Sequence, residues 1–510
     1  MRIALLAYRG NPYSGGQGVY VRQLSAALTR LGHRVTVFAG QPYPELVAGV
    51  PMVAVPSLDL YRADDPFRTP RRAEFRDWID VLEYAALCTA AFPEPLTFSL
   101  RARRLLLARR ADFDVVHDNQ CLGWGMLGLQ RAGMPLVASV HHAVVIDRDL
   151  ELERATHLGR RLVLRRWYQF HHMQDRVARR MPRVITVSTQ SRQDIVQRMR
   201  LDPARIRVIP IAVDTTVFAP QPEVARVPGR IFAVASADIP LKGVVPLLHA
   251  VAALRRHREV ELVLLGEARR GGAVEKSLAQ LGLAGSVRLV RGIDDAAVAR
   301  HYAEAEVAVV PSLYEGFSIP AVQAMCCGVP LVATTAGALP EVAGRDGESA
   351  LLVSPGDAAE LARAISRLLD DPGLRARLSQ AALRRAGERY SWEATARATV
   401  EVYRDVLRAY HPTMSEEETT PHHHSLRERL DAAEAAADEV VAEESGQLGG
   451  EVNALAVPFE QLAAAVRAAI HPDELAAHEV VGSGEETTVD APASEGDAVA
   501  DVAGETPTRP

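Results

Sequence analysis

The stretch VVPSLYEGFSIPAVQAMCCGVP, residues 309–330, decides the fold of this chain. The apolar run 307–310 that leads into it predicts a short parallel strand buried on both faces. Pro320 fits the first turn of a helix, where its missing N–H is not needed, and Gly328 fits the end of that helix. The pattern therefore places Glu315 and the N–H groups of residues 316–319 at a helix N-terminus. Such a position binds anionic ligands at the carboxyl edge of an α/β sheet.

Strand and helix patterns alternate in two series on either side of a linker marked by Pro220, Pro222 and Pro228. The first series has predicted strands at 2–8, 34–39, 114–117, 135–140 and 183–187, with a last one after residue 206. The second has strands at 231–235, 261–265, 287–290, 307–310, 330–333 and 350–353. Residues 57–112 look irregular except for a basic helix at 98–110, and a long helix is expected at 391–410. This order predicts an α/β protein with two Rossmann-like, doubly wound domains that face a cleft.

Composition narrows the classes of protein that the chain can belong to. It has 510 residues, and 48% of them are apolar, which is enough for two or three domains. Its four cysteines are Cys88, Cys121, Cys326 and Cys327, and they form no metal-type CxxC pair, which favours a reducing compartment. No apolar run approaches the roughly 18 residues of a membrane span, and the first residues lack a signal-peptide pattern. We therefore expect a cytoplasmic protein.

The net charge of −6 hides a strong asymmetry along the chain. Residues 411–510 hold 22 acidic residues and 4 arginines, so this segment carries −18, and the remaining residues carry +12. We expect the acidic tail to be mostly disordered, with transient helices near 426–444 and 459–470. The basic body suits phosphate-bearing ligands or the inner face of an anionic membrane, with no nucleic-acid partner. The arginine-rich stretch 98–110 would then either lie on that membrane or pack on the sheet as a solvated helix.

A glycine-rich loop, which includes Gly15 and Gly16, follows the first predicted strand. Its glycines let backbone N–H groups approach a bound anion. The dinucleotide spacing G-x-G-x-x-G is absent, and no acid ends the second strand, which runs into Gly40. Both features argue against a nicotinamide cofactor.

In order and spacing, the motifs from residue 1 to about 410 resemble those of retaining GT-B glycosyltransferases of family 4. These motifs are Ser14-Gly15-Gly16, Val140-His141-His142, Ile209-Pro210, Pro240-Leu241-Lys242-Gly243, Pro311–Phe317, Gly328-Val329-Pro330 and Ala338-Leu339-Pro340-Glu341. The resemblance implies an acceptor domain at 1–212, a nucleotide-sugar domain at 213–390, and a helix at 391–410 that crosses back to the first domain. The acidic tail, 411–510, lies beyond it.

The resemblance also implies the reaction and the residues that perform it. A sugar would pass from a nucleotide donor, such as a UDP- or GDP-sugar, to a lipid, small-molecule or glycan acceptor, with retention at the anomeric carbon. Lys242, Glu315 and His141 would be the catalytic residues, and Lys242 would neutralise the diphosphate as the glycosidic bond breaks. The donor would also contact Gly15, Gly16, Gly316, Phe317, Ser318, Ile319, Gln323, Gly292 and Ile293. No metal or other cofactor is implied, because the lysine and the helix N-termini supply the positive field.

Two positions depart from the family pattern. Gln323 stands where the family has a second glutamate that binds the ribose hydroxyls, and the loss of one charged hydrogen bond costs on the order of 1–3 kcal/mol. Ser236 stands where the family tends to carry an arginine on the diphosphate. These departures motivate an alternative, a non-catalytic sugar-nucleotide binder or scaffold. A UDP-sugar epimerase with the same fold is a further alternative.

Overall fold

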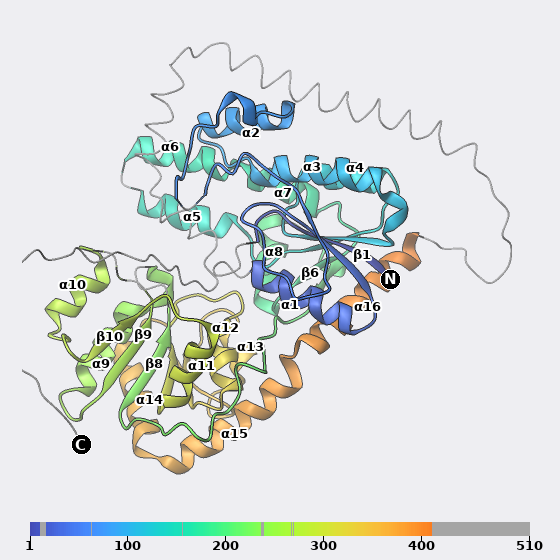
Figure 1. Ribbon diagram of the computed structural model, residues 1–510. Helices are drawn as coiled ribbons and strands as arrows, with labels where there is room; N and C mark the ends of the chain where they lie inside the picture. The colour runs from blue at the N-terminus through green and yellow to red at the C-terminus, as the bar shows by residue number, and fades with distance from the viewer. Residues whose placement is uncertain are drawn as a thin grey trace, which may run out of the picture.

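The computed structural model of the protein describes residues 1–10, 17–62, 64–155, 157–235, 239–266, 268 and 270–410 (Figure 1). The first domain has the strands β1 (Arg2–Ala7), β2 (Arg34–Ala39), β3 (Met52–Ala54), β4 (Val115–Asn119), β5 (Leu136–Ser139), β6 (Val184–Thr186) and β7 (Ile206–Val208). Its α-helices are α1 (Gln17–Arg30), α2 (Trp78–Cys88), α3 (Glu94–Ala108), α4 (Trp124–Arg131), α5 (Val145–Arg154), α6 (Leu158–Trp167), α7 (His171–Ala178) and α8 (Thr189–Met199).

The second domain repeats the alternation of strand and helix. Its strands are β8 (Arg230–Val234), β9 (Glu261–Leu265), β10 (Val287–Val290), β11 (Val307–Val310), β12 (Leu331–Thr334) and β13 (Leu351–Val353). The helices that follow residue 243 are α9 (Val244–Leu254), α10 (Ala273–Gln280), α11 (Asp295–Glu304), α12 (Ile319–Cys326), α13 (Leu339–Ala343), α14 (Ala358–Asp370), α15 (Pro372–Arg389) and α16 (Trp392–Tyr410).

Both sheets are parallel and doubly wound. The strand orders are β3-β2-β1-β4-β5-β6-β7 and β10-β9-β8-β11-β12-β13, so β1/β4 and β8/β11 are the points where the order reverses. The loops that leave the carboxyl ends of two such neighbouring strands diverge, and ligands of α/β sheets bind between them. The predicted fold class is therefore confirmed, and the loops after β8 and β11 are marked as a binding site by topology alone.

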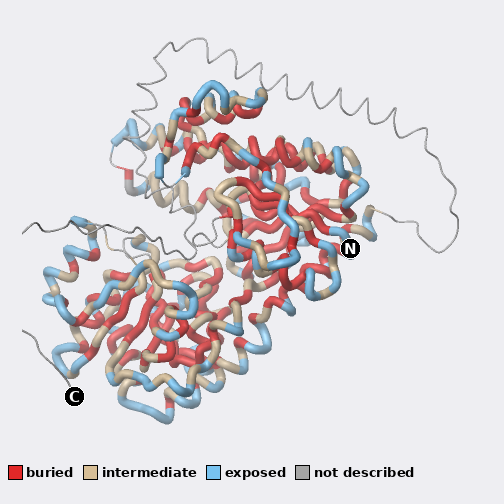
Figure 2. The backbone as a smooth tube through the Cα atoms, in the orientation of Figure 1, coloured by how far each residue is buried: buried red, intermediate tan, exposed pale blue. Residues whose placement is uncertain are grey.

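Apolar side chains fill both faces of each sheet. In Figure 2 the buried stretches of backbone lie in the interior of the two domains. One face of the first sheet packs on helices α3, α4, α7 and α8, while the opposite face packs on α1 and α16. Helix α16 belongs to the end of the described chain, yet its Tyr403 and Val406 are buried beside Ile3 and Leu5. The expected return of the last helix to the first domain is thus confirmed.

The stretch 57–112 is less irregular than expected, because it contains α2, which was not predicted. The predicted basic helix 98–110 is present as α3, which begins earlier, at Glu94, and ends at Ala108. Short strand β3, at residues 52–54, was also missed, since its three residues are largely exposed and carry no clear pattern. A separate small core, which includes Leu60, Tyr61 and Trp167, packs this region against α5 and α6. The first domain therefore holds an additional layer that the alternation of strands and helices did not reveal.

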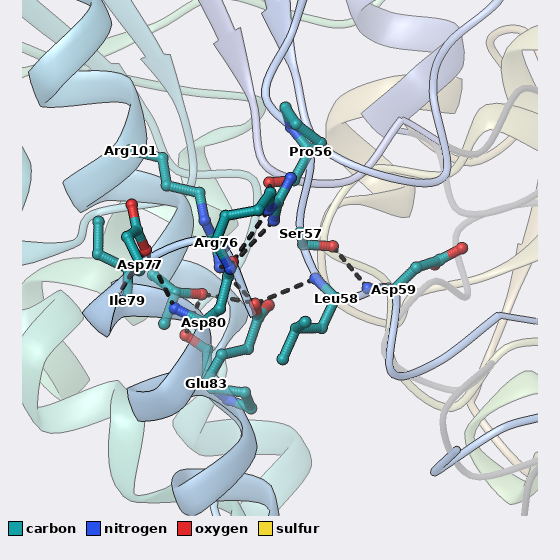
Figure 3. A network of polar contacts seen from close by, with 12 residues as sticks. Pro56, Ser57, Leu58, Asp59, Arg76, Asp77, Ile79, Asp80, Glu83 and Arg101 are labelled. Atoms are coloured by element: carbon teal, nitrogen blue, oxygen red, sulfur yellow. Dashed lines mark hydrogen bonds and ion pairs between the residues drawn. The ribbon is translucent and has the colours of Figure 1, made fainter. Parts of the chain in front are cut away.

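A network of buried charges, drawn in Figure 3, holds α2 against α3. The Arg101 guanidinium contacts Asp80 Oδ1 at 2.6 Å and Glu83 Oε2 at 2.5 Å, and Arg76 adds a second cation at 2.8 Å from Asp80. Glu83 also accepts a hydrogen bond from the N–H of Leu58 at 3.2 Å. Arg101 is thus committed to the interior, while Arg104 of the same helix pairs with Asp77 at the surface. The arginines of α3 are therefore engaged in packing, which favours the hypothesis of a helix on the sheet.

Removal of Arg101 should destabilise the first domain strongly. Arg101→Met would leave Asp80 and Glu83 buried with one fewer cation, and breaking a buried pair in this way costs about 3–5 kcal/mol. Arg104→Met is the matched control, since an exposed pair contributes about 0–1 kcal/mol. Urea unfolding followed by circular dichroism measures both variants. Equal losses in the two variants would contradict this assignment.

Candidate active site

Glu315 lies in the loop that leaves β11, and its side chain is only 7% exposed. Its Oε1 accepts hydrogen bonds from Ser312 Oγ at 2.7 Å and from Lys242 Nζ at 3.1 Å. Lys242 comes from the loop after β8, the neighbouring strand at the reversal point of the sheet. The two residues are 73 positions apart in sequence, and the structure brings them into one ion pair. In the described part of the chain, the site therefore pairs the Lys242 ammonium with the Glu315 carboxylate at the carboxyl edge of the sheet.

Two glycines allow the loops around this ion pair to approach one another. A Cβ at Gly243 would lie 1.9 Å from the carbonyl oxygen of Pro311, and a Cβ at Gly337 would lie 2.1 Å from that of Glu315. Both distances are far below contact, and both glycines have positive φ angles, of +66° and +55°. The N–H of Ala338 then donates to the Glu315 carbonyl at 2.9 Å. Backbone contacts thus hold the acidic loop from both sides.

The residues that follow Glu315 differ in their conformation and in what they contact. Ser318 caps α12 and takes a left-handed conformation at φ 94°, which is unusual for a residue with a side chain. Phe317 is 6% exposed, and its ring packs edge-on against Tyr390 at 5.8 Å between ring centres. The ring of Phe317 therefore belongs to the core of the second domain. Gly316 and Ile319 are half-buried on either side.

Gln323 lies one turn into α12, where its Oε1 is 3.5 Å from the Tyr302 hydroxyl. Gly292 and Ile293 follow β10 at the edge of the sheet, and Gly292 has a φ of +61°. These three positions occupy the same carboxyl edge as Glu315, although no contact joins them to it among the described residues. Gly15, Gly16 and Ser236 lie outside the described residues, as does the acidic tail.

His141 lies in the first domain, at the carboxyl end of β5. Its Nε2 is 2.7 Å from Asn119 Oδ1, and its N–H donates to Gln120 Oε1 at 2.7 Å. Burial, together with the charge of His142, lowers the pKa of His141 to about 3, so the ring is neutral near pH 7. The Tyr20 ring packs edge-on against it at 4.7 Å. A neutral, fixed imidazole of this kind can hydrogen-bond a sugar hydroxyl.

The pKa of the neighbouring His142 is shifted in the opposite direction. Burial acts to lower its pKa, but the Asp147 carboxylate at 2.8 Å from Nε2 outweighs that effect and raises the pKa. Asp147 is on the first turn of α5, so this pair joins the strand end to that helix. Sequence reasoning passed over Asp147 because only the fold places it beside His142.

A set of hydrogen bonds joins the two domains around the acidic loop. Ser188 Oγ and Ser191 Oγ both donate to the Gly316 carbonyl, and the Tyr314 hydroxyl donates to Asp194. All three partners from the first domain belong to α8 or its N-cap. Because the Gly316 carbonyl belongs to the peptide whose N–H is that of Phe317, these bonds orient that N–H.

Glu341 makes the second cross-domain contact. Its carboxylate accepts from the N–H of Thr189 at 2.8 Å and from the Thr189 hydroxyl at 3.1 Å. The motif residue Glu341 therefore acts, in this structure, at the N-terminus of α8, where a negative charge is favourable. The sequence alone did not assign it this role.

Comparison with known proteins places the chain in a family. A model described as Glycosyltransferase Family 4 matches residues 14–217, and one described as Glycosyl transferases group 1 matches residues 228–371. The chain is 53% identical over 408 residues to the MMP alpha-(1->4)-mannosyltransferase of Mycolicibacterium hassiacum, covering 80% of this chain and 98% of that protein. It is 30% identical to the D-inositol 3-phosphate glycosyltransferase of Kineococcus radiotolerans, covering 79% and 95%.

Solved structures show the same fold. Sucrose-phosphate synthase of Thermosynechococcus elongatus matches with a TM-score of 0.61 at 24% identity, over 80% of this chain and all of that one. Anabaena HepE, solved in complex with UDP, matches with a TM-score of 0.58 at 19% identity, over 79% and 100%. The fold is thus that of the GT-B glycosyltransferases. The chain belongs to glycosyltransferase family 4, and it is a glycosyltransferase.

The close approach at Gly337 can be tested directly. Gly337→Ala should displace the Glu315 carbonyl and lower kcat/KM about 100-fold, since a shift of about 1 Å at a catalytic group has effects of that size. Gly347→Ala is the control, because Gly347 has a φ of +74° but nothing within 4 Å of an added Cβ. Steady-state kinetics measures both. Equal losses would mean that backbone strain, and not the contact with Glu315, is responsible.

A second test uses buried His117, which lies between the Tyr403 hydroxyl at 2.6 Å and Ser139 Oγ at 2.7 Å. Burial lowers its pKa to about 3, with His141 adding to the effect. Below the unfolded-state pKa of about 6.5 the unfolded chain binds one more proton at this residue, so stability falls as the pH falls.

Between pH 7 and pH 5 this residue should reduce the free energy of unfolding by about 2 kcal/mol. The loss is about 1.4 kcal/mol per pH unit, and it begins only below the unfolded-state pKa of about 6.5. His117→Gln should remove that part of the pH dependence. Buried Asp118, whose pKa burial raises to about 6, has the opposite sign and is common to both proteins. Urea unfolding at the two pH values gives the difference, and an unchanged pH dependence in the variant would refute the assignment.

Proposed function

We propose that the protein transfers a mannosyl group from a nucleotide sugar to the 4-hydroxyl of a saccharide acceptor, with retention at the anomeric carbon. The Lys242–Glu315 pair at the reversal point of the second sheet carries the proposal. The 53% identical relative is an alpha-(1->4)-mannosyltransferase, which supports the choice of sugar and linkage. UDP in the complex of HepE supports a nucleotide donor, as a likeness in fold.

Lys242 and Glu315 would divide the work at the donor. Lys242 is 18% exposed, so its ammonium can turn from Glu315 toward a diphosphate without crossing the core. There it would stabilise the negative charge that grows on the leaving group, while the N–H groups of residues 316–319 hold the donor at the helix N-terminus. Glu315, kept in place by Ser312, would accept hydrogen bonds from sugar hydroxyls. The positive charges needed at the diphosphate would come from the chain, so a metal ion is not required.

The first domain would present the acceptor. Neutral His141 would hydrogen-bond the sugar or the acceptor, and the cross-domain bonds from Ser188 and Ser191 would keep the two halves of the site in register. With a donor whose mannose is α-linked, an α-linked product is the outcome of retention. Gln323 would contact the ribose with its amide in place of a carboxylate.

The test is a donor screen with purified protein. We expect acceptor-dependent consumption of one of UDP-, GDP- or ADP-mannose in preference to the glucose donors, unchanged by EDTA, with an α-(1→4) product by NMR. Glu315→Gln and Lys242→Ala should each lower kcat about 10²–10³-fold, the usual cost of one group that stabilises transition-state charge. Lys276→Ala, on exposed α10, is the matched control and should keep full activity.

Other outcomes would contradict the proposal in distinct ways. Binding of no nucleotide sugar at millimolar levels would favour a non-catalytic binder, and a gain in turnover by Gln323→Glu would count against that alternative. A changed sugar without any acceptor would indicate an epimerase. A β-linked product from an α-linked donor would refute retention.

A further inference from the structure

A basic groove lies between α5, α6 and α7, on the additional layer of the first domain. It has a volume of about 610 Å³, and its lining includes Arg148, Leu162, Arg165, Arg166, His171 and His172. A second groove of about 350 Å³ continues it past Trp124 and Arg176, and the two share Gln169 and His172. None of the described residues that line either groove is acidic.

Helix α6 borders this groove and exposes apolar and cationic side chains together. Leu158 and Leu162 are 81% and 65% exposed, which is unusual for leucine on a folded domain. The helix has four arginines and no acid. Within the described part of the chain, Arg161 and Arg165 form no ion pair. In contrast to the arginines of α3, these cations are available to a partner.

The groove is suited to an anion and not to a cation. His171, His172 and Asp175 lie within 4.8 Å of one another, a spacing that a metal ion can use. However, the Arg148 guanidinium lies 2.5 Å from His171 Nε2, and His171 Nδ1 lies 3.4 Å from Asp175. Both ring nitrogens therefore already have partners, and the adjacent guanidinium would repel a cation.

The chain itself supplies an anionic segment of matching character. Residues 426–444 contain seven acids and two arginines, a net charge of −5, and Leu426, Leu430, Ala433, Ala437 and Val441 recur at helical spacing. The two family models match within residues 14–371, so this segment lies outside both of them.

We propose that residues 426–444 bind the basic groove of the same molecule. The apolar residues of the segment would cover Leu158 and Leu162, and its acids would face Arg161 and Arg165. The 15 residues between Tyr410 and Leu426 can span up to about 55 Å when extended. A partner on such a tether has an effective concentration of millimolar order, so weak contacts suffice for binding. Its attachment favours this segment over an anionic lipid surface, which would otherwise suit the same side chains.

The test uses the full-length chain labelled with a fluorescent donor and acceptor at Glu153→Cys, on exposed α5, and Ser445→Cys. The four native cysteines are buried, so labelling is selective. Transfer efficiency should be at least twofold higher in 0.05 M NaCl than in 1 M NaCl, where the Debye length falls to about 3 Å. The double substitution Arg161→Glu and Arg165→Glu should lower it at 0.05 M to the high-salt value. Leu162→Gln should lower it in part.

The matched control places the same charge changes on the other domain, at exposed Arg363→Glu and Arg377→Glu, and should leave the transfer efficiency unchanged. Equal effects of the two double variants would overturn the proposal, because long-range charge alone would then explain them. Transfer between separately labelled molecules would show that the segment binds a second copy instead. If the α6 double variant lost binding to phosphatidylserine vesicles but kept its transfer efficiency, the groove would be a lipid surface and the proposal would be wrong. None of these readouts depends on transferase activity.

Discussion

The contact between the loops after β8 and β11 is the constraint on which the site depends. Lys242 reaches Glu315 only because Gly243 lets its loop touch the carbonyl of Pro311, at a distance that leaves no space for a side chain. Gly337 does the same on the other side of Glu315. The backbone loops that carry the acid and the lysine, from distant parts of the chain, are thereby held next to each other. This is the kind of preorganisation that electrostatic catalysis requires.

The two domains are joined through the same loop. Hydrogen bonds from Ser188 and Ser191 to the Gly316 carbonyl, together with the Thr189–Glu341 contact, connect the acidic loop to the first domain. Helix α16 provides a second connection, since its Tyr403 is buried against His117 of β4. The geometry of the donor loop and the relative position of the domains are therefore coupled. A substitution in either place is expected to affect both.

Charge is distributed so that each basic region has a separate task. In the first domain, buried Arg101 neutralises Asp80 and Glu83 and so fixes α2 on α3. On α6, Arg165 is exposed and Arg161 half-buried beside the exposed Leu158 and Leu162. Lys242 is the cation at the acidic loop. Composition gave a basic body without distinguishing these roles, because burial and pairing depend on which helices meet.

The local sequence pattern was sufficient to predict the alternating fold and the position of Glu315 between a strand and a helix. A buried strand, an acid, a proline and a glycine follow one another there, and this order indicates where the loop and the next helix begin and end. The resemblance to the family, and not local pattern, singled out Lys242 and His141. Local pattern did not reveal α2 or β3, nor the partners of Glu341 and His142: Thr189 lies 152 positions from Glu341, and Asp147 meets His142 only because α5 begins beside the end of β5. The N–H of Phe317 was expected at the donor, and the structure adds that the ring of this residue packs in the core against Tyr390. Sequence determined which groups are present at each strand end, and only the packing of two sheets decided which of them meet.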